Sequence, residues 1–364
     1  MVRLKVAVAV TAGALAGGLA VPSAASADAA QVVYAWGYNN WGQAGADPNV
    51  AGTDLLSPVP VHGAAANVTQ LSGPNGPYKG RYVLSLRSDG TVWGWGRNYI
   101  GVLGDVSGST FTPVQIQGLP PNIVQISAGG IHAAALAADG SVWTWGGNNA
   151  GQLGYPTPGA QYSTVPHQVP GVSGVKQVSA GGEFTVALRS NGEVWTWGRN
   201  DHGQLGDGTL TGHSTPERVT GLPVYIAGIS AGGGFTARLG DGISATGGFA
   251  TVLGTDGTVW AWGDDSAGQL GNARSSIPVT RPVNTIGAGS GITQLSAGDF
   301  HVLALKSNGT ALAWGSNGSG QLGNGTTTDP AGPVQVTGPA NTTQVAAGGR
   351  FSLAVHTVLG LVGS

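Results

Sequence analysis

The chain has 364 residues, of which only 9% are charged, and its formal net charge is −2 at pH 7. So few basic residues argue against binding to the phosphate backbone of nucleic acids, which draws its affinity from clusters of Lys and Arg. The sequence has no cysteine, which excludes disulfides, thiol chemistry, cysteine-ligated zinc and iron–sulfur clusters.

The first 27 residues have the order of a secretory signal peptide. Arg3 and Lys5 precede an apolar stretch over residues 6–20, and Ala25-Ser26-Ala27 is a small-residue cleavage site. A membrane anchor is the alternative, but about fifteen apolar residues are short for a span. We therefore expect cleavage before Asp28, a secreted, extracellular protein without membrane insertion, and a single domain over residues 28–364.

A repeat begins near residue 32. Its clearest copy, residues 126–154, reads ISAGGIHAAALAADGSVWTWGGNNAGQLG. The apolar run over residues 133–136 is followed by Asp139-Gly140, a dipeptide suited to a tight hairpin turn, and then by an alternating strand. Trp143 and Trp145 share one face of that strand, and we expect both to be core residues.

Six copies of a strand that ends in Trp-Gly give the architecture. They stand at Trp36, Trp95, Trp145, Trp197, Trp262 and Trp314. A Gly-Gln-Leu-Gly element or a weaker form of it follows each one, and then a proline with a short apolar strand. Each unit thus has about four short strands. Such units fit the blades of a β-propeller better than a solenoid, because their apolar faces must stack radially. The sequence predicts an all-β propeller of six four-stranded antiparallel blades.

Two stretches depart from the regular repeat. Residues 229–257 hold the first half of a unit twice, with one Trp strand after them, which indicates an inserted hairpin or, if it is a degenerate blade, a seventh blade. The chain also begins with the Trp half of a unit, residues 32–37, and ends with the complementary half, residues 344–355. We predict that these halves pair and close the ring without a free edge strand.

The repeat resembles the regulator of chromosome condensation repeat family. The order AGG-x-[HF]-x-x-A-L, then DG, then W-x-WG-x-N-x-x-GQLG is kept in several copies over residues 32–357. The resemblance implies a propeller, commonly of seven blades. Nuclear members are guanine-nucleotide exchange factors for a small GTPase, a partner that an exported, mildly acidic chain would not meet. The units are also distantly similar to secreted bacterial β-lactamase inhibitor propellers of this repeat class, which implies a protein-binding role.

Residues that differ between copies fall in two sets of loops, one after the Trp strand and one after Ala-Gly-Gly. One interpretation is that they are unconstrained turn residues. The other is that they form a binding surface, because loops on a rigid scaffold carry function and large apolar side chains at loop tips are typical interface anchors. The resemblance to the inhibitor propellers implies a contact set of Trp41, Tyr99, Ile100, Asp201 and His202 from the first loops and Ile131, Glu183, Phe300 and Arg350 from the second.

Motifs for catalysis, a cofactor or a metal are sparse. His132 and His301 stand at a repeat position that Phe184 and Phe235 occupy in other copies, which indicates buried structural histidines. Asp201, His202 and Asp207 could act as acid and base in a propeller hydrolase or lyase with a tunnel site. We prefer a secreted, non-enzymatic monomer that binds another protein, possesses no catalytic residues, needs no cofactor or metal, and does not bind nucleic acid.

Overall fold

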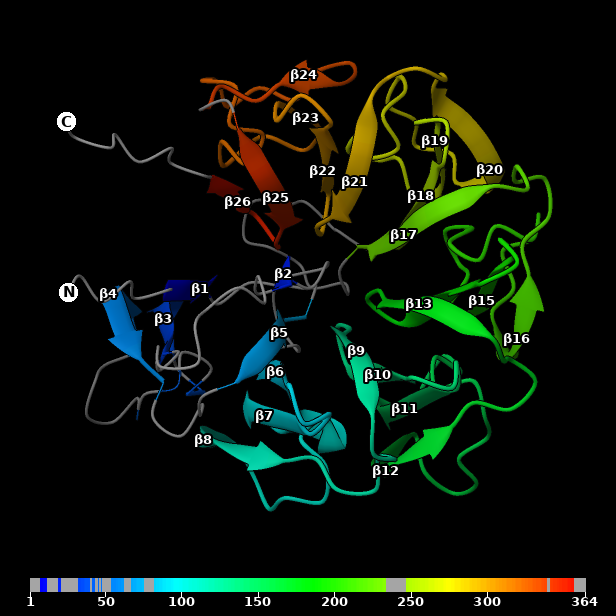
Figure 1. Ribbon diagram of the computed structural model, residues 1–364. Coiled ribbons are helices and arrows are strands. Elements are labelled where there is room, and N and C mark those ends of the chain that lie inside the picture. Colours follow the sequence, from blue (N-terminus) through cyan, green and yellow to red (C-terminus); the bar gives the residue numbers. More distant parts are fainter. Residues whose placement is uncertain are drawn as a thin grey trace.

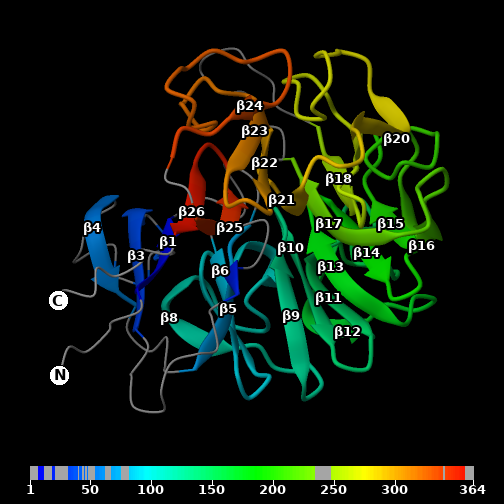
Figure 2. The ribbon, with the colours of Figure 1, turned by 45° about the horizontal axis from the view of Figure 1, so that its top comes forward.

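Antiparallel sheets stand around a common axis and form a ring (Figure 1), and the tilted view in Figure 2 shows the sheets stacked side by side. This computed structural model describes residues 7–11, 19–20, 32–39, 41–42, 45, 47, 54–61, 67–74, 82–233, 247–338 and 341–356, with the backbone alone for residues 7–11, 19–20, 32–38, 54–59 and 356. The predicted β-propeller of four-stranded antiparallel blades is confirmed.

Five blades have the complete set of four strands. The first strand of each lies nearest the axis, and the next three follow outward in chain order (Figure 1). The blades are β5 (Val68–Ser72), β6 (Tyr82–Arg87), β7 (Val92–Gly96) and β8 (Thr110–Gln115); β9 (Ile123–Ala128), β10 (His132–Ala137), β11 (Val142–Gly147) and β12 (Tyr162–Gln168); β13 (Val175–Ala180), β14 (Phe184–Arg189), β15 (Val194–Gly198) and β16 (His213–Arg218); β17 (Ile226–Gly232), β18 (Phe249–Gly254), β19 (Val259–Gly263) and β20 (Val279–Ile286); and β21 (Ile292–Ala297), β22 (His301–Lys306), β23 (Ala311–Gly315) and β24 (Val334–Gln335).

The hairpin of β10 and β11 shows why these residues form a blade. Every side chain of the apolar strand β10 is buried, and Ala133 pairs with Trp145 across the ladder. Gly140 makes the turn with a φ of +81°, a conformation that side chains with a Cβ rarely adopt. The same turn glycine joins the second and third strands of the other four complete blades.

In four blades, the tryptophan before the strand-ending glycine joins its blade to the preceding one. The Trp197 indole is fully buried and donates a hydrogen bond to the Gln152 carbonyl of the preceding blade at 2.9 Å. The equivalent bonds run from Trp145 to Val102, Trp262 to Gln204 and Trp314 to Gln269, at 2.9 to 3.0 Å. The first tryptophan, such as Trp143, is only half-buried. The prediction that both are core residues is right for the second alone.

Glutamine and serine side chains link the inner strands. Gln70 of β5 donates to the Ile126 carbonyl of β9 and accepts from the Ile126 amide, each at 2.9 Å. Ser72 then accepts from the Ala128 amide of the same neighbour. Gln125, Gln177 and Gln294, with Ser127, Ser179, Ser230 and Ser296, make the equivalent contacts around the ring. Gly228 takes the glutamine position in β17.

The strands on either side of the duplicated stretch belong to one blade. β17 pairs directly with β18, with Ile229 opposite Val252, so the duplicated half-unit is an insertion between two strands and not a seventh blade. Residues 234–246 lie outside the described part. The repeat position that the sequence suggested for Phe235 belongs to Phe249, which pairs with Gly263 as Phe184 pairs with Gly198.

Two smaller sheets stand at the seam of the ring. β25 (Thr342–Ala347) and β26 (Ser352–His356) form a hairpin, and β3 (Val32–Tyr38) pairs with β4 (Asp54–Pro60) on one side and with β1 (Ala7–Thr11) on the other. β2 (Leu19–Ala20) adds to the inner edge of β5. The predicted pairing of the terminal half-units therefore differs from the structure, because β1 pairs in parallel with the edge of β3 expected for β26. With five complete blades and two partial sheets, the six-blade count stays a prediction.

Candidate functional site: the loop face

The two sets of variable loops meet on one face of the propeller. The Gly147 amide donates to the Ile131 carbonyl at 2.7 Å, and the Arg199 amide donates to the Glu183 carbonyl at 2.9 Å. The same bond joins Asp264 to Gly248 and Ser316 to Phe300. Because it recurs in four blades, the loop after the Trp strand always lies beside the tip of the first hairpin. We call this surface the loop face.

Repeated polar residues hold these loops rigid. In the loop after β15, the Asn200 side chain accepts from the Leu205 amide at 2.9 Å and donates to the Thr209 and Thr211 carbonyls. Gln204 accepts from the His202 amide at 2.8 Å. The variable side chains are thus presented from fixed backbones, which favours recognition because little ordering is needed on binding.

Exposed aromatic side chains and an arginine gather beside β7. The Arg97 guanidinium lies 4.3 Å from the centre of the Trp41 ring and 5.0 Å from that of the Tyr99 ring. Trp41 is 39% exposed and Tyr99 is 44% exposed. The cation holds both rings by cation–π attraction while they remain open to solvent. We call these three residues the aromatic patch.

Ile100 continues the aromatic patch toward the next blade. Within the 3₁₀ turn η1 (Tyr99–Gly101) it has a φ of +64°, a strained conformation for a β-branched residue. It lies against Gly147 together with Ile131 and lines a pocket of about 420 Å³. Ile131 itself is buried, so it supports the pocket instead of standing out as a tip. Tyr162, 45% exposed on β12, forms the far wall.

An ionic cluster occupies the next blade of the loop face. Arg199 contacts the buried Glu183 at 2.7 Å and Asp201 at 2.5 Å, and His202 Nδ1 lies 3.0 Å from Asp201. Burial raises the pKa of Asp201, but hydrogen bonds from His202 and Arg199 outweigh it and hold that pKa below its usual range. The bond to Asp201 raises the pKa of His202. Glu183 is covered, so Asp201 and His202 form the accessible part.

The remaining candidate residues lie nearer the seam. Phe300 is half-buried between β21 and β22, and Arg350 is exposed between β25 and β26. The structure therefore groups Trp41 with Tyr99, Ile100 with Ile131, and Glu183 with Asp201 and His202, and it places Phe300 and Arg350 on other blades. The sequence reading missed Arg97, Arg199 and Tyr162. A cation at the third position of W-G-x-N, beside an exposed aromatic or acidic residue, is the signal that could have found the two arginines.

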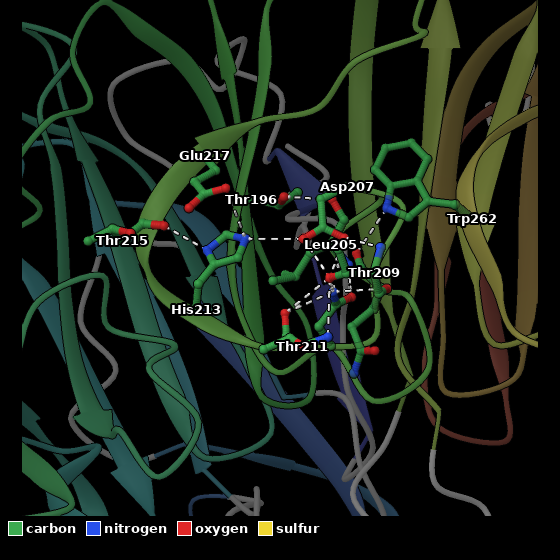
Figure 3. A network of polar contacts seen from close by, with 11 residues as sticks. Thr196, Leu205, Asp207, Thr209, Thr211, His213, Thr215, Glu217 and Trp262 are labelled. Atoms are coloured by element: carbon green, nitrogen blue, oxygen red, sulfur yellow. Dashed lines mark hydrogen bonds and ion pairs between the residues drawn. The ribbon is translucent and has the colours of Figure 1, made fainter.

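Of the proposed acid–base set, Asp201 and His202 contact each other, and the partners of Asp207 are other residues. Figure 3 shows Asp207 in a second network, where it accepts from Thr209. The Asn200 side chain also donates to Asp207, at 3.1 Å. The other neighbour of Asp207 is His213, 3.8 Å away, which also lies 3.9 Å from Glu217 (Figure 3). Within the described residues, no group of three or more His, Cys, Asp or Glu could hold a metal ion.

His132 and His301 are buried structural residues, as the sequence indicates. His132 Nε2 lies 2.9 Å from Thr185 Oγ1 of the next blade, and His301 Nε2 lies 2.9 Å from Ser352 Oγ. Burial lowers the pKa of His132 to about 3 and that of His301 to about 4. Both imidazoles are therefore neutral at physiological pH and serve blade packing.

Family comparisons agree with this geometry. A model of the RCC1-like domain matches residues 80–361. The chain belongs to the RCC1-like domain family. It is 31% identical over 269 residues to the ultraviolet-B receptor UVR8 of Arabidopsis thaliana, covering 72% of this chain and 57% of the receptor. It is 32% identical over 296 residues to the mitochondrial RCC1 domain-containing protein RUG3 of the same plant, covering 76% and 61%. The RCC1-like chain thus spans less than two thirds of these relatives.

Solved structures show the same fold. Human WBSCR16 superposes with a TM-score of 0.77 at 22% identity, covering 98% of this RCC1-like chain and 88% of that one. Prp20p of Saccharomyces cerevisiae, described with its binding properties to Gsp1p and histones, gives 0.74 at 22% identity, covering 91% and 80%. The same yeast protein bound to Kap60 gives 0.74 at 21% identity, covering 90% and 76%.

No helix within the described residues is long and apolar enough to span a bilayer.

Proposed function

We propose that this RCC1-like propeller is an exported, non-enzymatic binding protein that holds another protein on its loop face. The observation that carries the proposal is the aromatic patch beside the pocket of Ile100. Exposed large aromatic side chains with an arginine are the composition of interface hot spots. Leaving them open to water carries a solubility risk unless a partner covers them.

Strain at Ile100 supports the same surface. A non-glycine residue in the left-handed region costs about 1–2 kcal/mol, and such strain gathers at binding and catalytic sites. Here it places an aliphatic side chain at the wall of the pocket, between Tyr99 and Ile131. Asp201 and His202 on the next blade supply a polar rim. An apolar centre with a charged border fits a protein partner better than a phosphate-rich one, given the low content of Lys and Arg.

The relatives support binding as the kind of function. Prp20p of yeast is described with binding to Gsp1p and histones and is solved with Kap60. At 21–22% identity the two yeast structures share the fold of this chain. The partner of this chain must therefore be identified by experiment. An inhibitor of an extracellular enzyme is one such role, and export through residues 1–27 would bring the two together.

The test is affinity capture from culture supernatant and cell envelope with the full chain and two variants. Trp41→Ala with Tyr99→Ala removes the exposed rings, and Tyr225→Ala is the matched control, because Tyr225 is 73% exposed in the loop that contacts Thr255 at the opposite face. We expect one protein to be captured by the parent and by Tyr225→Ala, with at least a thirtyfold loss of affinity in the double variant, about 2 kcal/mol. Equal affinity in all three would refute the loop-face assignment, and large destabilisation of the double variant would show that the rings are structural.

A further inference from the structure

Asparagine followed by glycine recurs in the turns and loops of this chain. In such a pair the glycine nitrogen can attack the side-chain carbonyl carbon of the asparagine, because a glycine has no Cβ to obstruct the approach and its backbone adjusts freely. Four pairs lie in the described residues, and a fifth, residues 75–76, lies outside them. The four begin at Asn191, Asn308, Asn317 and Asn324. Their surroundings in the folded protein decide which of them can react.

Two of the pairs are held in hairpin turns that occupy the nucleophile. The Gly192 amide donates to the Arg189 carbonyl at 2.9 Å. The Gly309 amide donates to the Lys306 carbonyl at the same distance. Each of these nitrogens would have to give up its hydrogen bond and leave the turn before it could attack. Folding therefore protects both pairs.

The third pair is protected through its side chain. Asn317 is fully buried, its NH2 group lies 3.1 Å from four oxygens of its own loop, and its Oδ1 accepts from the Leu322 amide at 3.0 Å. The reaction requires the side chain to turn toward the following nitrogen and to release its NH2 group. Both steps would break this network, so the folded loop blocks them.

Asn324 is arranged in the opposite way. It lies half-buried in the loop after β23, on the loop face, and Gly325 is exposed with a φ of +80°. The Gly325 amide has no hydrogen-bond partner among the described residues. Three donors surround Asn324 Oδ1: the Thr326 amide at 3.2 Å, the Thr326 hydroxyl at 2.9 Å and the Asn317 NH2 group at 3.1 Å. The nucleophile is thus open, and the carbonyl that it attacks is polarised.

These three donors form an oxyanion hole for the reaction. Negative charge develops on Oδ1 when the glycine nitrogen attacks the side-chain carbonyl. Donors that the fold already aims at that oxygen stabilise the charge without further reorganisation. Asn308 Oδ1 has two such donors among the described residues, both from Thr310, but its glycine nitrogen is occupied. Only Asn324, of the four pairs, combines a free nucleophile with the three donors.

We propose that Asn324 converts to aspartate in the folded propeller without an enzyme. The Gly325 nitrogen loses its proton to hydroxide and forms a bond to Cγ of Asn324. The bond from Cγ to Nδ2 then breaks, and ammonia leaves. Water opens the resulting cyclic imide at Cγ, which leaves a carboxylate on the side chain and restores the glycine amide. The conversion adds one negative charge to the loop face.

Another blade already has the contacts that the product would make. In the loop after β15, Asp207 accepts from the Thr209 amide at 2.7 Å and from the Thr209 hydroxyl at 2.9 Å (Figure 3). The Asn200 NH2 group is its third donor, at 3.1 Å. These are the same three donors, at the same places in the repeat, that surround Asn324. A carboxylate at position 324 therefore fits the loop, and the propeller keeps its fold after the conversion.

Peptide mapping of the full chain tests the ranking of the pairs. The protein is incubated at pH 8 in its folded state or unfolded in guanidinium chloride, and its chymotryptic peptides are followed by tandem mass spectrometry. Cleavage after Trp314 and Leu322 separates the three pairs nearest the C-terminus. We expect Asn324 to react in the folded protein at least as fast as in the unfolded chain. The other three pairs should react at least tenfold more slowly when folded. Protection of Asn324 to the same degree as the others would overturn the proposal.

Three variants test the donors and the product. Thr326→Val removes the hydroxyl donor and should slow the reaction at Asn324 at least threefold in the folded protein, whereas the matched control Thr310→Val should leave that rate unchanged. The parent's rate in folded Thr326→Val would overturn the oxyanion hole. Asn324→Asp should have the thermal midpoint of the parent, because its carboxylate keeps the three donors. A lower midpoint would show that the loop does not accept the product.

Discussion

Replacing Asp265 by Asn should stabilise the propeller at neutral pH. Four equivalent loops have Asn98, Asn148, Asn200 and Asn317, whose amide groups accept from a leucine amide and donate to backbone carbonyls. Asp265 accepts from the Leu270 amide at 3.1 Å, but its second oxygen is buried without a donor among the described residues. Burial raises the pKa of Asp265 to about 6, with the neighbouring Asp264 adding to the rise and Arg274 opposing it.

The sign and size follow from that pKa. An acid whose pKa is raised on folding costs stability once it ionises, so this contribution grows as pH rises from about 4 to above 6. From the ordinary value of 3.8 to about 6, at about 1.4 kcal/mol for each pKa unit, the cost reaches at most about 3 kcal/mol above pH 6. Asn ionises at no pH. Its side-chain NH2 group, a donor, takes the place of the second carboxylate oxygen, as in the four equivalent loops. We therefore expect Asp265→Asn to gain about 1–3 kcal/mol at pH 7.5 and almost nothing at pH 4.

Urea denaturation at both pH values measures the two differences. The matched control is the reverse change in another blade, Asn200→Asp, which should lose stability at pH 7.5 and lose less at pH 4. An Asp265→Asn variant with the same free energy of unfolding as the parent at pH 7.5 would refute the reasoning. So would a gain that is equal at both pH values, because ionisation would then play no part.

Three further predictions concern the joints between blades. His132→Phe should reduce the loss of stability between pH 7 and pH 5 by about 2 kcal/mol. The reason is that the pKa of His132 is lowered to about 3 in the folded protein, so the stability that this residue contributes above pH 6.5 is lost as the pH falls. An unchanged difference between the urea midpoints at the two pH values would contradict this. Trp197→Phe should cost about 1–3 kcal/mol in the free energy of unfolding, because the Gln152 carbonyl loses its indole donor, whereas the half-buried Trp195→Phe should cost less; equal losses would argue against the hydrogen bond. Gly228→Gln should add about 1 kcal/mol by supplying the missing side-chain link to the next inner strand, and a lower thermal midpoint would show that the glycine is needed there.

The repeat alone was sufficient for most of the fold. Turn dipeptides such as Asp139-Gly140, the alternating Trp strands and the proline-containing outer strands are local signals, and the structure has each of them in place. The sequence also indicated that residues 229–257 hold an insertion. The position of Phe249 was missed because both half-units of that stretch carry the same pattern, and only pairing with Gly263 tells them apart.

The loop face was predictable in outline only. Variation between copies identified the loops, and hydrogen bonds such as that from Gly147 to Ile131 place them together. Pattern could not show that Ile131 and Glu183 are covered, because burial depends on neighbouring blades. Nor could it show that Arg97 stacks on Trp41 and Tyr99, since that contact joins residues from two loops. Edge pairing at the seam depends on which strands compete, and this too is absent from local sequence.

The glutamine and serine side chains that link the inner strands around the axis have an evolutionary consequence. Each of these hydrogen bonds joins a side chain of one blade to a backbone atom of the next, as between Gln70 and Ile126. Side chains of the receiving blade can therefore be substituted without losing these hydrogen bonds. A duplicated unit would bring its own glutamine and serine, which can bond to the backbone of any neighbouring blade. The loops of such a ring are free to diversify one blade at a time, so a new partner can be acquired without redesigning the scaffold.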